Sequence, residues 1–485
     1  MRSLTKPTTA VLAASAVAIG LLSACSASTD APDSTPDAST SDETSPDETT
    51  PAAPQDVTLR VVSLLPGSDQ AAFDAFDERV AQFEELYPNI DVEAEEYEWK
   101  ATTFAAQLAG GTLPDVYEIP FTDAKTLIEN GQLADVDAQF NALPYAGDFN
   151  EALLEAGKGP DGHVYAIPAK SIYGVALHYN RALFEAAGLD PDDPPTTWDE
   201  VRAAAKAIKD ATGVAGYAQM AADNTGGWQL TSATYARGGR TQVVEADGSY
   251  TATLTNPATK ASLEFLRALR WEDDSLYADA TLNWGTINEK FAAGQIGMYT
   301  SGSDVYTALA ESFGVTPDSS GLKVSDYGLT AIPNEGADSG VLVGGTLAAV
   351  NIKADDAVKD AAVKWIDFFY LQPHLDEGPA VENAKIRFDN GQPVGTPVLP
   401  IFSREQYETS LGWIEEFINV PLENMTGYTD VMFDQPVVGE PSASTQEIYA
   451  LLDVPIQAVM TDQNADVDAL LEQAQTQAQA LLDEG

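Results

Sequence analysis

Val57-Thr-Leu-Arg-Val-Val-Ser-Leu-Leu65 opens the stretch of sequence that decides the fold. This run of β-branched and aliphatic residues predicts a strand, and Pro66-Gly67-Ser68 ends it. Apolar side chains then recur at spacings of three and four residues, which predicts an amphipathic helix. These side chains are Phe73, Phe76, Val80, Phe83 and Tyr87.

Two more strand–helix units follow along the chain. Residues 90–94 and 116–119 read as strands, a helix carrying Phe104 and Leu108 lies between them, and a helix is expected over residues 123–130. The order β-α-β-α-β-α is typical of an α/β fold whose parallel strands are wound by helices. Ligands of such sheets bind beyond the carboxyl ends of the strands. Here those ends are residues 65–70, 97–100 and 118–123.

The same alternation continues to the end of the chain. Thr197 and Glu200 form a capping box that predicts the start of a helix ending near residue 211. Further strands are expected over residues 164–168, 174–179, 329–333 and 347–352, and further helices over residues 356–371 and 466–483. The 429 residues from Val57 onward exceed a typical single domain, so two or more lobes are expected.

The N-terminus has the layout of a secretory signal. Arg2 and Lys6 precede an apolar run over residues 10–22, which is too short to span a membrane. The following Leu22-Ser23-Ala24-Cys25 resembles a bacterial lipobox, which predicts lipidation of Cys25, the only cysteine in the chain. One alternative is an ordinary signal peptide that happens to end near a cysteine.

Residues 26–56 contain only Ser, Thr, Ala, Asp, Glu, Pro and one Gln. Such a segment buries too little apolar surface to fold, and it predicts a disordered acidic tether of about 30 Å. A disordered leader without a spacing role is the alternative.

The net charge, the single cysteine and the histidine positions exclude several classes of function. A net charge of −50 excludes nucleic acid as a partner. A single cysteine excludes an intrachain disulfide and a thiolate metal cluster. The three histidines, His163, His178 and His374, form no metal motif, and no Gly-x-Ser-x-Gly elbow is present. No catalytic residue, metal or cofactor is therefore expected.

Several blocks of sequence carry a resemblance to a known family. Phe83-Glu-Glu-Leu-Tyr-Pro-Asn-Ile-Asp-Val92 and Leu108-Ala-Gly-Gly-Thr-Leu-Pro-Asp-Val116 resemble family 1 extracellular solute-binding proteins, the lipoproteins that serve carbohydrate ABC importers. The resemblance continues in family order through Tyr165-Ala-Ile-Pro168, Leu177-His-Tyr-Asn180, Leu183-Phe-Glu-Ala-Ala-Gly-Leu-Asp190, Pro195-Thr-Thr-Trp-Asp-Glu200, Phe291-Ala-Ala-Gly-Gln-Ile-Gly-Met298 and Gly344-Gly345.

The resemblance implies a periplasmic-binding-protein-like fold, in which two discontinuous α/β lobes close on a ligand about a hinge. It places lobe 1 in residues 57–171 and 341–381. Lobe 2 is placed in residues 172–335 and 382–485. The chain is expected to cross between the lobes near residues 170–173 and 332–340.

The resemblance also suggests ligand-binding residues. Trp228 would stack on a sugar ring, or would be a core residue. Glu118, Thr122 and Asp123 follow the third strand, where they would contact the ligand or cap the next helix. The family usually has a tryptophan just after the glycine that ends the Met298 strand, where this chain has Ser301-Gly302-Ser303-Asp304. Asp304 would either bind the ligand or cap a helix. The remaining candidates are Gln70, Trp99 and Tyr173.

We therefore expect a monomeric, lipid-anchored, extracytoplasmic protein that is not an enzyme. It would capture a sugar or oligosaccharide and deliver it to the permease subunits of an ABC importer. Two alternatives stay open at this point: the same fold binding a cationic osmolyte or polyamine, and a secreted hydrolase.

Overall fold

The computed structural model describes residues 55–64, 70–97 and 99–484. The signal sequence with Cys25, most of the expected tether and the expected strand end at residues 65–69 lie outside the described residues. Within the described part of the chain, no helix combines the length and the apolarity that a membrane span requires.

Three parallel strands begin the fold and confirm the expected β-α-β-α-β-α order. β1 pairs in parallel with both β2 and β3. Gly111, in the left-handed conformation with φ of 70°, ends the second helix. These elements are β1 (Val57–Val62), α1 (Gln70–Leu86), β2 (Ile90–Glu95), α2 (Ala101–Gly110), β3 (Val116–Pro120) and α3 (Phe121–Glu129).

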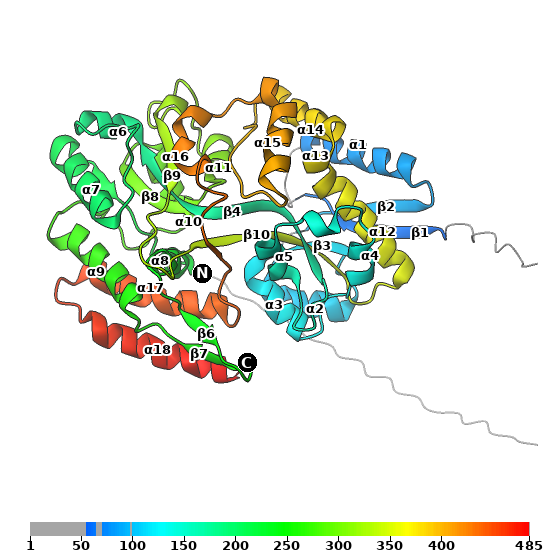
Figure 1. Ribbon diagram of the computed structural model, residues 1–485, viewed down its shortest axis with the longest axis horizontal. Helices are drawn as coiled ribbons and strands as arrows, with labels where there is room; N and C mark the ends of the chain where they lie inside the picture. Colours follow the sequence, from blue (N-terminus) through cyan, green and yellow to red (C-terminus); the bar gives the residue numbers. More distant parts are fainter. Residues whose placement is uncertain (1–54, 65–69, 98, 485) are drawn as a thin grey trace, which may run out of the picture. The chain divides into compact units, whose positions relative to one another are not determined.

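The largest sheet has the strand order β2-β1-β3-β10-β4-β8-β5. It is mixed, because β10 (Val341–Val350) runs antiparallel to both β3 and β4 (Ala166–Asn180). The strands expected over residues 164–168 and 174–179 are therefore one continuous strand, β4. In Figure 1, β4 and β10 run side by side through the middle of the ribbon and connect its two groups of elements.

Both long strands bend at the same level. Ser171 has a positive φ of 50°, and the register between β10 and β4 shifts between Gly344 and Thr346. Residues 166–174 of β4 pair with β10 on both sides of the bend, and residues 175–180 pair with β8 (Ile296–Gly302) and β9 (Tyr327–Ala331). We call the group around β1–β3 the first lobe and the group around β8 and β9 the second lobe.

Helices of the second lobe cover this far part of the sheet. The capping box at Thr197 and Glu200 is confirmed, and it opens α7 (Trp198–Thr212). The other main elements here are α6 (Arg181–Ala186), β5 (Ala215–Tyr217), α8 (Thr225–Ala236), β6 (Gln242–Val244), β7 (Tyr250–Ala252), α9 (Pro257–Trp271), α10 (Trp284–Ala292), α11 (Val305–Glu311), α17 (Thr445–Thr461) and α18 (Val467–Glu484).

The helix expected over residues 356–371 consists of α12 (Asp356–Ile366) and a π-helical segment, Asp367–Leu371. Trp365 on α12 is fully buried and stacks on Phe369 with ring centroids 5.1 Å apart. The remaining elements are α4 (Asp137–Asn141), α5 (Glu151–Leu154), α13 (Gln372–Leu375), α14 (Glu377–Asp389), α15 (Arg404–Trp413), α16 (Thr426–Thr429) and β11 (Val437–Val438).

Residues after 381 contact both lobes. Phe402 packs edge-on against Phe149 of the first lobe, with ring centroids 4.8 Å apart. Arg387 of α14 forms an ion pair of 3.2 Å with Glu311, which belongs to α11 of the second lobe. These contacts fasten the C-terminal part of the chain across the region where β4 and β10 bend.

Candidate ligand-binding site

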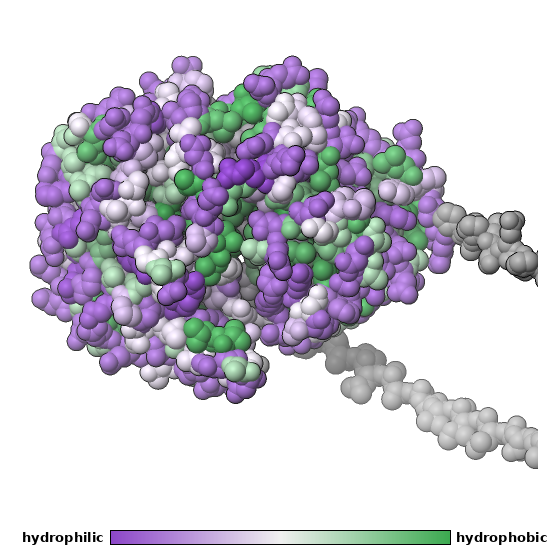
Figure 2. Space-filling model, in the orientation of Figure 1, coloured by the Kyte–Doolittle hydropathy of each residue, from purple (hydrophilic) through white to green (hydrophobic). Residues whose placement is uncertain are grey.

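A cavity of about 610 Å³ lies where the two lobes meet. Thr122 of α3 lines it from the first lobe, and Tyr173 of β4 lines it from the bend. Trp228 of α8 and Asp304, which follows β8, line it from the second lobe. The space-filling view in Figure 2 shows a hollow near the middle of this face, bordered by hydrophobic and hydrophilic residues.

Trp228 is positioned by the tight packing of α8 on α17. Asp453 of α17 accepts hydrogen bonds of 2.9 Å from the backbone amides of Asn224 and Gly227. Gly227 lies against the backbone of Tyr449, since a Cβ built on Gly227 would be 2.1 Å from the Tyr449 carbonyl oxygen. The first turn of α8 is therefore fixed, and it carries Trp228 into the cavity wall.

Tyr173 lies between two glycines that leave room for its ring. A Cβ on Gly302 would lie 3.0 Å from the Tyr173 Cγ, and a Cβ on Gly344 would lie 2.4 Å from its hydroxyl oxygen. The ring of Tyr173 meets the ring of Trp228 edge-on, with centroids 6.0 Å apart and planes at 75°. Burial raises the pKa of Tyr173 well above its usual value, and the nearby Glu440 and Asp304 add to this shift.

Asp304 occupies the N-cap position of α11, but its side chain caps no backbone amide of that helix. Its Oδ1 lies beside Gly302, only 2.7 Å from where a Cβ of that residue would be. Burial raises the pKa of the Asp304 carboxyl to about 6. Since the capping hydrogen bond is not made, the carboxylate remains available to the cavity.

Glu440 is a cavity residue that the sequence analysis missed. Its Oε1 accepts a hydrogen bond of 3.1 Å from Trp228 Nε1, and its Oε2 accepts one from the Tyr449 hydroxyl. Burial raises the pKa of the Glu440 carboxyl to about 7. Glu440 lies in the sequence Val437-Val-Gly-Glu-Pro441, which matches no motif, so no local signal marks it.

Trp284 also lines the cavity, and its side chain is unusually exposed for a tryptophan. It is the first residue of α10, it is 43 % exposed, and its ring lies 6.2 Å from that of Phe313. The sequence alone left Trp284 open between a ligand-binding role and a core role.

The cavity brings together Trp228, Thr122, Tyr173 and Asp304 from the predicted set. The other four predicted residues lie outside its lining, each with protein partners of its own. Glu118 accepts hydrogen bonds from Tyr370 at 2.8 Å and pairs with Lys170 at 2.7 Å. Gln70 donates to Asp74, Trp99 packs on Phe104, and Asp123 accepts a hydrogen bond of 3.1 Å from Thr122.

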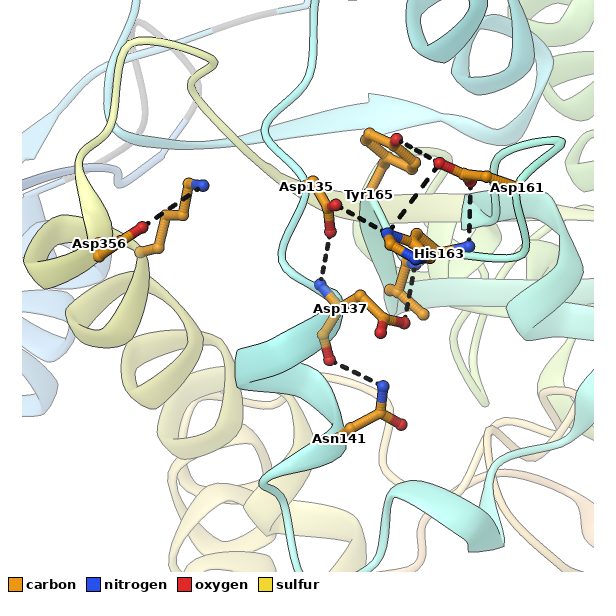
Figure 3. Close-up of polar contacts among 9 residues, drawn as sticks. Asp135, Asp137, Asn141, Asp161, His163, Tyr165 and Asp356 are labelled. Atoms are coloured by element: carbon orange, nitrogen blue, oxygen red, sulfur yellow. Dashed lines mark hydrogen bonds and ion pairs between the residues drawn. The ribbon is translucent and has the colours of Figure 1, made fainter.

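None of the three histidines lies in the lining of the cavity. His163 pairs with Asp135 at 2.8 Å, while Asp161 accepts from the Tyr165 hydroxyl and from the His163 backbone amide (Figure 3). This exposed network closes the loop before β4. His178 is buried and His374 is half-buried, and the loss of solvation lowers the pKa of each imidazole to about 4. Among the described residues, no group of three or more potential ligands is arranged to hold a metal ion.

The curated relatives match only part of the chain. The sn-glycerol-3-phosphate-binding periplasmic protein UgpB of Yersinia pestis is 28 % identical over 162 residues, which are 32 % of this chain and 35 % of that protein. The chain thus spans about a third of the length of the first relatives it matches. A putative binding protein of Brucella abortus is 26 % identical over 303 residues, covering 61 % of this chain and 68 % of the relative.

Solved structures match nearly all of the described chain. The cyclic alpha-maltosyl-1,6-maltose binding protein of Arthrobacter globiformis has a TM-score of 0.65 and 23 % identity, covering 89 % of this chain and 100 % of that one. UgpB of Mycobacterium tuberculosis, solved with glycerophosphocholine, has a TM-score of 0.65 and 20 % identity, covering 88 % of this chain and 98 % of that one. These likenesses confirm the two-lobed α/β fold.

The match to a family model covers more of the sequence than the 162-residue match to UgpB of Yersinia pestis. Residues 78–375 match the family described as bacterial extracellular solute-binding protein. This match extends over more than half of the 485 residues, from α1 to α13. The chain therefore belongs to the bacterial extracellular solute-binding protein family.

Proposed function

We propose that this protein captures a saccharide in the cavity between its lobes and delivers it to an ABC importer. The observation that carries the proposal is the composition of the cavity wall, which combines aromatic rings with polar side chains. Aromatic faces pack against the apolar C–H faces of sugar rings, an extension of the usual preferences of aromatic side chains.

The cavity lining contains aromatic rings for the apolar faces of a sugar and amide groups for its hydroxyls. Trp228, Trp284 and Tyr173 supply rings, and Trp284 supplies the most exposed face. Asn224 and Gln446 supply planar amides that would both donate to and accept from hydroxyl groups. A few polar groups placed among apolar ones are typical of a small-molecule site.

The relatives support the same ligand class. The proteins from Arthrobacter globiformis and Listeria monocytogenes are named as binding cyclic alpha-maltosyl-1,6-maltose and cycloalternan. Both ligands are saccharides, and both proteins have the fold of this chain. The role of this family as binding proteins supports capture of the ligand without turnover.

Closure would follow the division into lobes expected from the sequence. We propose residues 57–171 and 341–381 for the first lobe and residues 172–335 and 382–485 for the second. The bend at Ser171 and the register shift at Gly344 lie on the two strands that join them, so both are placed to act as hinges.

We further propose that Cys25 carries a lipid and that residues 26–56 hold a monomer at the outer face of the membrane. One acyl chain binds a membrane only marginally, whereas two hold a protein stably. Mass spectrometry of the native protein is expected to find a lipidated Cys25 as the N-terminus. An unlipidated form with another N-terminus, released by wild-type cells, would contradict the anchor.

Calorimetric titration with mono- and oligosaccharides, both neutral and amine-bearing, tests the binding function. At least one saccharide is expected to bind, to compact the protein in small-angle scattering and to raise its melting temperature by linkage. Absence of binding across the panel would contradict the function, and binding without compaction would contradict the hinge.

A further inference from the structure

The charged groups of the cavity wall all have the same sign. The described lining residues include four carboxylates and no lysine, arginine or histidine; the carboxylates belong to Asp223, Asp304, Glu311 and Glu440. The undescribed residues 65–69 and 98 contain no basic residue in the sequence either. A phosphate-bearing ligand would therefore meet repulsion here without a compensating cation.

Two of the four carboxylates are already partnered by protein groups. Glu311 forms an ion pair of 3.2 Å with Arg387. Asp223 accepts a hydrogen bond of 2.8 Å from the side-chain amide of Asn283. These two carboxylates are the less available pair for a ligand.

The other two carboxylates face the cavity without a cation. Among the described residues, Glu440 accepts side-chain hydrogen bonds from the neutral groups of Trp228 and Tyr449 alone. Asp304 caps no amide of α11, and no cation of the described chain acts on its carboxylate. Charged groups shielded from water are normally paired with an opposite charge, so two half-buried carboxylates without a cation point to a cationic ligand that completes them.

The two carboxylates also share a neighbour. Both act on Tyr173, whose phenol pKa they raise, and the Asp304 carboxylate and the Tyr173 ring both abut Gly302. The ring of Trp228 meets that of Tyr173 edge-on. Aromatic rings beside carboxylates form the kind of site that attracts a cation through both charge and the ring quadrupole.

Resting on the proposed saccharide function, we propose that the ligand carries a protonated amine, which binds against Tyr173 between the carboxylates of Asp304 and Glu440. An ammonium group has three donors and a positive charge, so it would satisfy both carboxylates where a neutral hydroxyl supplies one donor. The raised pKa values of Asp304, about 6, and Glu440, about 7, show the cost of burying these charges without a cation.

The test compares matched ligands on the wild-type chain. Each pair consists of a neutral sugar and the amino sugar with the same skeleton: glucose and glucosamine, galactose and galactosamine, and cellobiose and the β-1,4-linked glucosamine dimer. The N-acetylated dimer and choline are added as controls. At pH 7, in at least one pair, the amino member is expected to bind at least tenfold more tightly than its neutral partner and the N-acetylated form.

Substitutions at the two carboxylates test whether they cause the preference for the amino sugar. Asp304→Asn and Glu440→Gln keep the shape of each side chain and are expected to weaken amino-sugar binding at least tenfold more than they weaken neutral-sugar binding. Glu245→Gln is the control, because this exposed carboxylate lies outside the cavity lining, and it is expected to change either affinity less than threefold. The wild-type ligand comparison stands even if a variant fails to fold.

The outcomes separate the inference from the function on which it rests. Neutral sugars that bind as tightly as their amino partners would overturn the amine inference and leave saccharide binding intact. Choline binding without any sugar binding would overturn the saccharide function and retain the cation. Failure of every probe would overturn both.

Discussion

The indole Nε1 of Trp228 donates a hydrogen bond of 3.1 Å to Oε1 of Glu440. This contact joins α8 to a residue 212 positions later in the chain, and it fixes the orientation of the ring at the cavity wall. The same carboxylate accepts from Tyr449 on α17. Trp228 and Glu440 are therefore directly coupled by a hydrogen bond, and a substitution of either residue should change the position of the other.

Trp228→Ala is expected to weaken saccharide binding by about 2–4 kcal/mol, in the range of buried aromatic anchors. The substitution removes the ring and one of the two hydrogen-bond donors to Glu440. Trp228→Phe keeps an aromatic face without the N–H donor, so an intermediate loss is expected. Calorimetry with the best saccharide of the panel gives the affinities.

The competing role for Trp228, a core residue, gives a different pattern. Truncation of a core tryptophan costs roughly 3–5 kcal/mol of stability. A large drop in melting temperature, with an unchanged Kd for the folded fraction, would show that Trp228 supports the core rather than the ligand.

Gly302→Ala tests the close packing behind Tyr173. The new Cβ would lie 2.7 Å from Asp304 Oδ1 and 3.0 Å from Tyr173 Cγ, so both side chains must shift. Saccharide affinity is expected to fall at least tenfold. Gly147→Ala is the control, because nothing lies within 4 Å of its added Cβ, and it should leave affinity unchanged. Equal affinities in the two variants would show that the Tyr173 position is unimportant.

The ligand-free protein should lose part of its stability as pH rises through the range set by Glu440. Its pKa is raised from 4.5 to about 7, so between these values the folded state binds more protons than the unfolded state. The free energy of unfolding therefore falls as pH increases across this window. Urea unfolding at pH 5 and pH 8 should show a smaller fall for Glu440→Gln than for the wild type. An equal fall in both would contradict the assignment.

His163 should titrate above the ordinary histidine pKa of 6.5, because its hydrogen bond and ion pair with Asp135 favour the imidazolium. Stability from this pair is present below pH 6.5 and is lost as pH rises through the raised folded-state pKa. NMR of the imidazole should show Asp135→Asn returning the pKa toward 6.5. Asp161→Asn should do less, because that carboxylate lies 4.0 Å away. No difference between the variants would contradict this reading.

Local patterns predicted much of the fold. The stripe containing Phe76 and Phe83 became α1, and the capping box at Thr197 became the start of α7. The antiparallel crossing of β10 was not predictable, since strand direction depends on pairing across more than 200 residues. The continuity of β4 was hidden because Lys170 and Ser171 are exposed and interrupt the apolar pattern.

Some residues of the candidate site could likewise be predicted from the sequence, whereas others could not. Trp228 and Asp304 carry recognisable chemistry near predicted element ends, and both line the cavity. Glu118 is also near a strand end, but Lys170 and Tyr370 occupy its carboxylate, and those partners come from distant segments. Glu440 lacked any signal because its importance arises from burial beside Trp228, a tertiary contact.

Intrinsic tryptophan fluorescence during titration of the full chain with saccharides tests the central claim most directly, with calorimetry on the same samples as reference. A saturable fluorescence change is expected with at least one saccharide in the wild type and in the Gly147→Ala control. In Trp228→Ala this change is expected to be lost or strongly weakened. A calorimetrically confirmed saccharide complex whose affinity and fluorescence change survive intact in Trp228→Ala would contradict the assignment of the binding site to this cavity.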